Sequence, residues 1–241
     1  MNHRVLLSAA AIAALAACSG APDAEVDENS KAEETESTTD EAKASDKTDN
    51  KSEQAAGAAE KPTKVSTELT CSNPVKADDT GKTLVERYGK DAKVEMLSGP
   101  EGTQVAGVVL WDGDPKRVIE VGFFDDARTE LGFVRFFEGS DWTLAELETG
   151  DTLERVIDIN NKPIKFYGFE WDYGGGVTDL GGGALDSIGS CSVGMRLAYD
   201  IEGGSLIPNS LIGDREVSST EPEVDKAHIL VNELSIGFPV K

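Results

Sequence analysis

Trp171, Asp172 and Tyr173 are the neighbouring residues best suited to bind a ligand in this chain. Aromatic rings can stack on sugars, and a carboxylate beside them could act with a second carboxylate in glycoside hydrolysis. The same residues could be structural instead, because aromatic side chains of strands often fill a core and Asp often caps a turn. The sequence identifies no second carboxylate. We therefore name Trp171, Asp172 and Tyr173 as candidate binding residues, assign no catalytic residue and favour a non-enzymatic role.

The chain has few side chains that could form a catalytic triad or a metal site. His228 is the single histidine outside the N-terminal leader, so a Ser-His-Asp triad would have one available base, and the chain has no G-x-S-x-G elbow. A zinc site would need His228 together with reduced Cys71 and Cys191. Asp112-Gly113-Asp114 and Asp125-Asp126 could bind calcium weakly, but neither has EF-hand spacing. We expect no metal and no cofactor.

The glycine runs and the net charge indicate which class of partner the chain could bind. Runs of three glycines occupy 174–176 and 181–183, but they have no adjacent basic residue and no phosphate-loop motif. The chain has a net charge of −22, and residues 66–241 contain 32 acidic and 16 basic residues. This charge repels phosphates and nucleic acid and attracts cations. We expect no nucleic-acid partner, and either a cation or another envelope protein as partner.

The N-terminus has the pattern of an export signal. Arg4 precedes a short apolar run, residues 5–14, which is too short to span a bilayer as a mature helix. The segment Leu15-Ala16-Ala17-Cys18 resembles the lipobox of bacterial lipoproteins. The resemblance implies a signal peptide at 1–17, lipidation of Cys18, and a membrane contact through the lipid. Ser19 after the cysteine implies the outer membrane of a Gram-negative bacterium. An ordinary secretory signal with an unrelated cysteine is the alternative.

Two further features follow the lipobox. Residues 18–65 form an acidic segment without aromatic residues, which predicts a disordered tether. Beyond it, Cys71 and Cys191 remain. Two cysteines in an exported domain most often pair, so we predict a Cys71–Cys191 disulfide. Two free thiols are the alternative.

Residues 66–241 are long enough for one domain with a hydrophobic core. Short apolar runs broken by Gly, Asp and Pro predict an α+β fold that is mainly antiparallel sheet. We expect two short helices, at 80–88 and 151–159. Each precedes a strand and begins with a similar sequence, which indicates either two related α-then-β units or a chance likeness of short amphipathic helices. The expected strands are 92–97, 104–110, 117–123, 132–137, 164–169, 193–199 and 228–238.

The stretch from 160 to 190 is the most distinctive in the chain. Residues 160–175 read N-N-K-P-I-K-F-Y-G-F-E-W-D-Y-G-G. They resemble the segment N-G-K-P-F-x-x-x-G-F-x-W-D-Y-G-G of uncharacterised bacterial exported proteins and lipoproteins. Asn161 and Ile164 depart from that pattern. The resemblance implies a shared α+β fold and no particular activity.

These features lead to a function in outline. We expect a cell-envelope lipoprotein with an acidic, non-catalytic interaction domain. One alternative is a domain that binds or hydrolyses glycan, with Trp171, Asp172 and Tyr173 at its site. Another is an inhibitor of a cationic protein, which the negative charge alone would favour.

Overall fold

The computed structural model describes residues 67–200 and 206–240. The expected signal peptide, the lipidated Cys18 and the tether lie outside the described residues. In the described part of the chain, no helix is long and apolar enough to cross a membrane.

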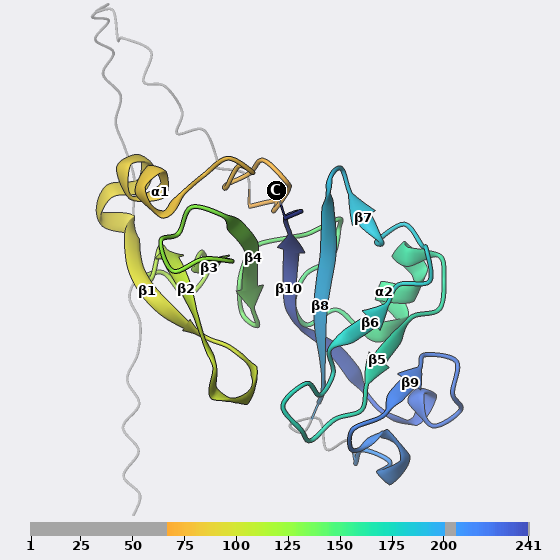
Figure 1. Ribbon diagram of the computed structural model, residues 1–241. Coiled ribbons are helices and arrows are strands. Elements are labelled where there is room, and N and C mark those ends of the chain that lie inside the picture. Colours follow the sequence, from red (N-terminus) through yellow and green to blue (C-terminus); the bar gives the residue numbers. More distant parts are fainter. Residues whose placement is uncertain (1–66, 201–205, 241) are drawn as a thin grey trace, which may run out of the picture. The chain divides into compact units, whose positions relative to one another are not determined.

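The largest element is a seven-stranded sheet in which every neighbouring pair is antiparallel. Strands β1 to β4 follow one another as a meander, and the sheet continues through β10, β8 and β7. Figure 1 shows that it curls along its length, so that one face is concave. Its strands, in sheet order, are β1 (Ala92–Ser98), β2 (Gln104–Leu110), β3 (Ile119–Phe123), β4 (Leu131–Phe137), β10 (Ile229–Gly237), β8 (Cys191–Tyr199) and β7 (Ser187–Ile188).

A second, smaller sheet and several helices complete the described fold. The small sheet has the order β6, β5, β9, also antiparallel. Two eight-residue α-helices precede β1 and β5, respectively. The bounds are β5 (Lys165–Tyr167), β6 (Val177–Asp179), β9 (Glu216–Ser218), α1 (Gly81–Tyr88), α2 (Leu153–Asn160), and the short 3-10 helices η1 (Gly89–Asp91), η2 (Pro100–Gly102), η3 (Asn209–Leu211) and η4 (Val224–Lys226).

Successive side chains along each strand of the large sheet point to opposite faces, so buried and half-buried residues alternate. In β4, Val134 and Phe136 are fully buried, whereas Phe133, Arg135 and Phe137 between and beside them are half-buried. Apolar residues on the convex face form one continuous core with α1, α2 and the smaller sheet. The concave face carries the charged residues Glu120, Arg135 and Glu233 together with apolar residues such as Leu97 and Val109.

Both α-helices begin at a threonine that caps the first turn. In α1, Thr80 and Thr83 satisfy each other's backbone N–H groups, as in a capping box. Burial alone would raise the pKa of the Asp79 carboxyl, but hydrogen bonds from Arg87 and from the backbone N–H of Lys76 outweigh it and lower that pKa. This pair fastens the last turn of α1 to the segment before the helix.

Asn160, the last residue of α2, is fully buried and joins three separate parts of the chain. Its Nδ2 donates to the carbonyl oxygens of Leu180 (2.8 Å) and Lys162 (3.0 Å). Its Oδ1 accepts from the backbone N–H of Leu185 at 3.0 Å. Gly183 leaves the room for this, because a Cβ there would lie 2.3 Å from that oxygen. One amide side chain therefore orders the loop between β6 and β7.

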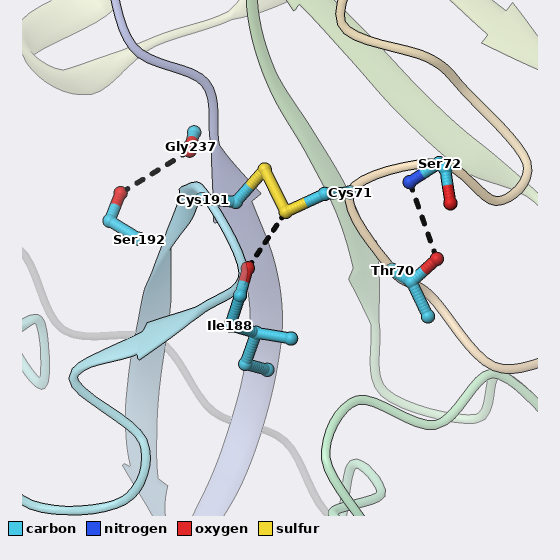
Figure 2. The surroundings of a disulfide bond; sticks show 7 residues. All are labelled: Thr70, Cys71, Ser72, Ile188, Cys191, Ser192 and Gly237. Carbon is cyan, nitrogen blue, oxygen red and sulfur yellow. Dashed lines mark hydrogen bonds between the residues drawn. A yellow bond between two sulfur atoms is a disulfide. The ribbon is translucent and has the colours of Figure 1, made fainter.

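The predicted disulfide is confirmed. Cys71 and Cys191 are bonded, with their Cα atoms 5.9 Å apart. Figure 2 shows that Cys71 approaches from the segment before α1 and Cys191 from the start of β8, with Ile188 beside them. The bond thereby holds the segment before α1, which contributes Leu69 and Val75 to the core, against the β7–β8 turn.

The α+β fold with a mainly antiparallel sheet and two short helices is also confirmed, with differences in detail. The strand expected at 164–169 ends at Tyr167, because the backbone N–H groups of Gly168 and Phe169 turn to the carbonyl oxygens of Arg215 and Leu211. The short strands β6, β7 and β9 were not predicted. The two related α-then-β units receive no support, since β1 enters the meander whereas β5 lies in the other sheet.

Candidate functional site

The concave face of the large sheet forms a groove of about 830 Å³. Its floor is built from β3, β4, β10 and β8. The tip of the β1–β2 hairpin forms one wall and the turn before β6 forms the other, and these two segments face each other in Figure 1. The lining residues are Ser98–Gly102, Glu120, Arg135, Phe137, Tyr167, Asp172, Tyr173, Gly176, Val177, Gly194, Met195, Arg196, Asn232, Glu233 and Ser235.

Arg135 occupies the middle of the floor and is held on every side. Its guanidinium lies 5.3 Å and 5.1 Å from the ring centroids of Phe133 and Phe137, its neighbours on the same face of β4. Glu120 stands directly opposite on β3, and Arg135 Nε donates to its Oε2 at 2.7 Å. Arg135 Nη2 also donates to the carbonyl oxygen of Ser98 at 2.9 Å. Arg135 therefore fixes the hairpin tip over the floor.

Glu233 lies beside this pair on β10, opposite both Phe137 and Arg196. A β-bulge at Asn232 shifts the register, so Asn232 and Glu233 both line the groove. Burial raises the pKa of the Glu233 carboxyl, although Arg135 and Arg196 oppose the shift. Its Oε2 is 3.8 Å from Arg135 Nη1, and within residues 67–200 and 206–240 its side chain makes no hydrogen bond. The carboxylate is thus partly desolvated and still open to a donor.

The second wall is the turn at 171–176. Arg196 donates from Nε to the carbonyl oxygen of Gly174 at 2.9 Å and from Nη2 to that of Asp172. Gly175 has φ of +75°, and a Cβ there would lie 1.9 Å from the carbonyl oxygen of Leu197. Only glycine combines this backbone conformation with so close an approach. The backbone of β8 therefore holds the turn in place.

The three candidate binding residues have different positions. Asp172 and Tyr173 line the groove. Trp171 is absent from the lining and packs behind them, with its ring centroid 5.2 Å from those of both Tyr167 and Tyr173. Its Nε1 donates to the carbonyl oxygen of Gly168 at 2.8 Å. Trp171 thus supports the wall that carries the other two residues.

The structural interpretation of Asp172 as a carboxylate that caps its turn is wrong. Backbone groups close the turn, through the N–H of Gly174 to the carbonyl oxygen of Trp171 and the N–H of Gly176 to that of Tyr173. No hydrogen bond to the Asp172 carboxylate occurs within the described part of the chain, where the residue is exposed. This carboxylate is available to a ligand.

Sequence reasoning missed the charged residues of the floor: Glu120, Arg135, Arg196 and Glu233. A signal was present, because Arg135 interrupts the apolar run F-V-R-F-F and Glu233 lies within L-V-N-E-L. A charged residue in the middle of a strongly apolar strand faces water or a partner charge. What the sequence could not show is that four strands bring these residues to one face.

Two glycines on this face are covered by side chains of the neighbouring strands, and one of them, Gly194, lines the groove. A Cβ on Gly122 would lie 2.2 Å from the ring of Phe133, and a Cβ on Gly194 would lie 2.4 Å from Ser235 Oγ. Both glycines lie on the concave face of the sheet. Their neighbours on the next strands can therefore lie flat against the backbone.

The other candidate groups have structural partners. His228 Nδ1 is 3.1 Å from Asp200 Oδ2, an exposed pair at the start of β10. Asp125 accepts from the backbone N–H groups of Thr129 and Glu130, which lower its pKa. Asp112 pairs with Lys93 at 3.2 Å. Within the described ranges, no three His, Cys, Asp or Glu residues gather in an arrangement that could hold a metal ion.

Comparison with known proteins finds no family model, no curated protein and no solved structure that matches this chain.

Proposed function

We propose that this chain is a lipid-anchored envelope protein whose folded domain binds a partner in the concave groove and carries out no catalysis. The observation that supports this most directly is the rigid construction of the groove. Its two guanidinium groups are fixed by Glu120 and by backbone oxygens of both walls. A site fixed in this way before binding loses little conformational entropy when a ligand enters.

The anchor rests on the N-terminal sequence. Cleavage before Cys18 followed by acylation would attach more than one acyl chain, which is enough for stable membrane binding. The resemblance of 160–175 to a segment of uncharacterised exported proteins and lipoproteins agrees with a place in the envelope. An acidic tether of residues 19–65 would hold the groove away from the lipid surface, on the outer membrane of a Gram-negative bacterium.

The Cys18→Ser variant tests the anchor. We expect the wild-type protein in the membrane fraction of a Gram-negative host and the variant in the soluble envelope fraction, because the lipid cannot attach to serine. Fractionation followed by mass spectrometry of the mature N-terminus measures both. A wild-type protein that is recovered in solution with an unmodified Cys18 thiol would rule out the anchor.

A photo-reactive amino acid tests the groove in the intact envelope. Placed at Tyr173, on the rim, benzoylphenylalanine is expected to form a discrete adduct upon illumination. Placed at Lys82, whose side chain on α1 is 84% exposed and outside the groove, it should form none. Equal labelling from both positions, or an absence of labelling from position 173, would contradict binding in the groove.

Glycan binding is the second candidate function. It is favoured by Tyr167 and Tyr173, whose rings line the groove next to the open carboxylate of Asp172. Such rings can stack on sugars, and carboxylates accept hydrogen bonds from sugar hydroxyl groups. Under this candidate, a neutral oligosaccharide would occupy the groove without dependence on salt.

A further inference from the structure

The hydrogen-bonding groups of the groove are not balanced between donors and acceptors. Its two strongest donors, Arg135 and Arg196, already bond to Glu120 and to the carbonyl oxygens of Ser98, Asp172 and Gly174. The carboxylates of Glu101, Asp172 and Glu233 make no hydrogen bond within residues 67–200 and 206–240. The groove therefore offers a ligand three carboxylates that accept no hydrogen bond from the described residues, of which Glu233 lies 3.8 Å from Arg135 Nη1.

The charges lead to the same conclusion. Four carboxylates line the groove against two guanidinium groups, and residues 66–241 contain 32 acidic and 16 basic residues. A concave surface with one prevailing sign of charge focuses its field and raises the local concentration of oppositely charged ligands. An anionic ligand would meet repulsion both at long range and at contact.

The aromatic rim suits the same kind of ligand. The ring centroids of Tyr167 and Tyr173 are 6.5 Å apart with their planes inclined at 62°, and both residues line the groove beside Asp172. An ammonium or guanidinium group can bind over such rings while it pairs with the neighbouring carboxylate. A neutral ligand would use the rings but would leave the carboxylate without a countercharge.

The length of the groove indicates an extended ligand. Its floor crosses four neighbouring strands, from β3 to β8. With strands about 4.8 Å apart, the floor is about 14 Å wide between the outer two strands. An extended peptide advances about 3.4 Å per residue, so about four residues fit across the floor. A single small amine would leave most of the groove empty.

We infer that the groove binds an extended segment of a partner protein that carries several lysine or arginine side chains. One cationic side chain pairs with Glu233 at the centre of the floor. A second binds at the rim formed by Asp172, Tyr167 and Tyr173, and the opposite end lies near Glu101. This inference rests on the proposed function of the groove and specifies the chemistry of its partner.

Calorimetric titration of the purified full-length protein with hexalysine tests the inference. At low ionic strength we expect saturable binding that weakens steeply with added salt. Glu233→Gln should raise the dissociation constant by about tenfold or more, because the amide keeps the shape and removes the central charge. Asp172→Asn should weaken binding less, since its carboxylate is exposed and screened by water.

Glu154→Gln is the matched control. Glu154 is exposed on α2, outside the groove, so this variant has the same net charge as Glu233→Gln. We expect its dissociation constant to stay within twofold of that of the wild type. Equal weakening by both variants would show that hexalysine responds only to total charge, and that result would overturn the inference.

Melting curves show whether the variants fold. Burial raises the pKa of the Glu233 carboxyl in the folded chain. At a pH above the pKa of this group in the unfolded chain, the ionised carboxylate therefore lowers the stability of the folded state. Glu233→Gln should therefore melt no lower than the wild type at pH 7. A fall in melting temperature at pH 7 would contradict this picture of an open, desolvated carboxylate. Asp172→Asn, on the exposed rim, then provides a second test of binding.

Other ligands give outcomes that separate the inference from the proposed function. Hexaglutamate should not bind, and spermidine should compete only weakly with hexalysine because it has three cationic groups where hexalysine has six side-chain ammonium groups. Strong competition by spermidine, or tight binding of chitohexaose with none of hexalysine, would overturn the inference of a basic segment. Labelling from position 173 in the envelope does not depend on charge. If hexalysine fails to bind but this labelling is still observed, the proposal of groove binding stands without the inference of a basic segment. If the labelling is absent, both the proposed function and the inference fail.

Discussion

Replacing Cys71 and Cys191 together by alanine is expected to lower the free energy of unfolding by about 4 kcal/mol, the largest effect that we predict. The bond joins residues 120 apart in the sequence. In the chain-entropy model, closing so long a loop restricts the unfolded chain strongly, and that restriction is lost in the variant. Urea unfolding followed by tryptophan fluorescence measures the difference, and a larger m-value should accompany it as the unfolded chain expands.

Reduction of the wild-type protein provides the control. With dithiothreitol present, the wild type should unfold at nearly the urea concentration of the double alanine variant, because both lack the same cross-link. Hexalysine affinity should stay unchanged, since neither cysteine lines the groove. A double variant within 1 kcal/mol of the oxidised wild type would show that the unfolded chain is already compact near this loop.

Replacing Asn160 by alanine is expected to have the second largest effect, about 3 kcal/mol of lost stability. The variant leaves the carbonyl oxygens of Lys162 and Leu180 and the N–H of Leu185 without their partner, at a position that is fully buried. Each buried polar group that loses its hydrogen bond costs about 1–3 kcal/mol unless water reaches it. Thermal and urea unfolding of the variant measure the loss.

The neighbouring asparagine is the matched control. Asn161 ends α2 in the left-handed conformation, with φ of 55°, and is exposed. Asn161→Gly should change stability by less than about 0.5 kcal/mol, because glycine adopts this conformation readily. If Asn160→Ala were equally mild, the loop between β6 and β7 would not depend on the bonds that the structure shows.

The sequence predicted those parts of the fold that depend on local patterns. The helices expected at 80–88 and 151–159 occur as Gly81–Tyr88 and Leu153–Asn160, and the apolar run at 132–137 lies in β4. The disulfide was predicted from the presence of two cysteines in a domain that the N-terminal pattern leads us to expect outside the cytoplasm. The short strands β6, β7 and β9 have two or three residues each, which is too few for any period to be recognised.

The site was predicted less completely, for a physical reason. Asp172 and Tyr173 attracted attention because they are neighbours in sequence, and both do line the groove. Glu120, Arg135 and Glu233 come from three different strands, and their proximity depends on register and on the bulge at Asn232. Register is set by pairing across the sheet, which a single sequence does not display. Trp171 was assigned to the site although its ring supports the wall from behind.

The glycines of the concave face have a consequence for how this protein can diverge. Gly122 and Gly194 lack a side chain, so that Phe133 and Ser235 lie close against the backbone, and Gly194 and Ser235 both line the groove. A single methyl group at Gly194 would displace Ser235 Oγ, 2.4 Å from the added carbon, and change the shape of the groove there. Selectivity could therefore drift through a change at one uncharged position of the groove, while every charged group stays in place.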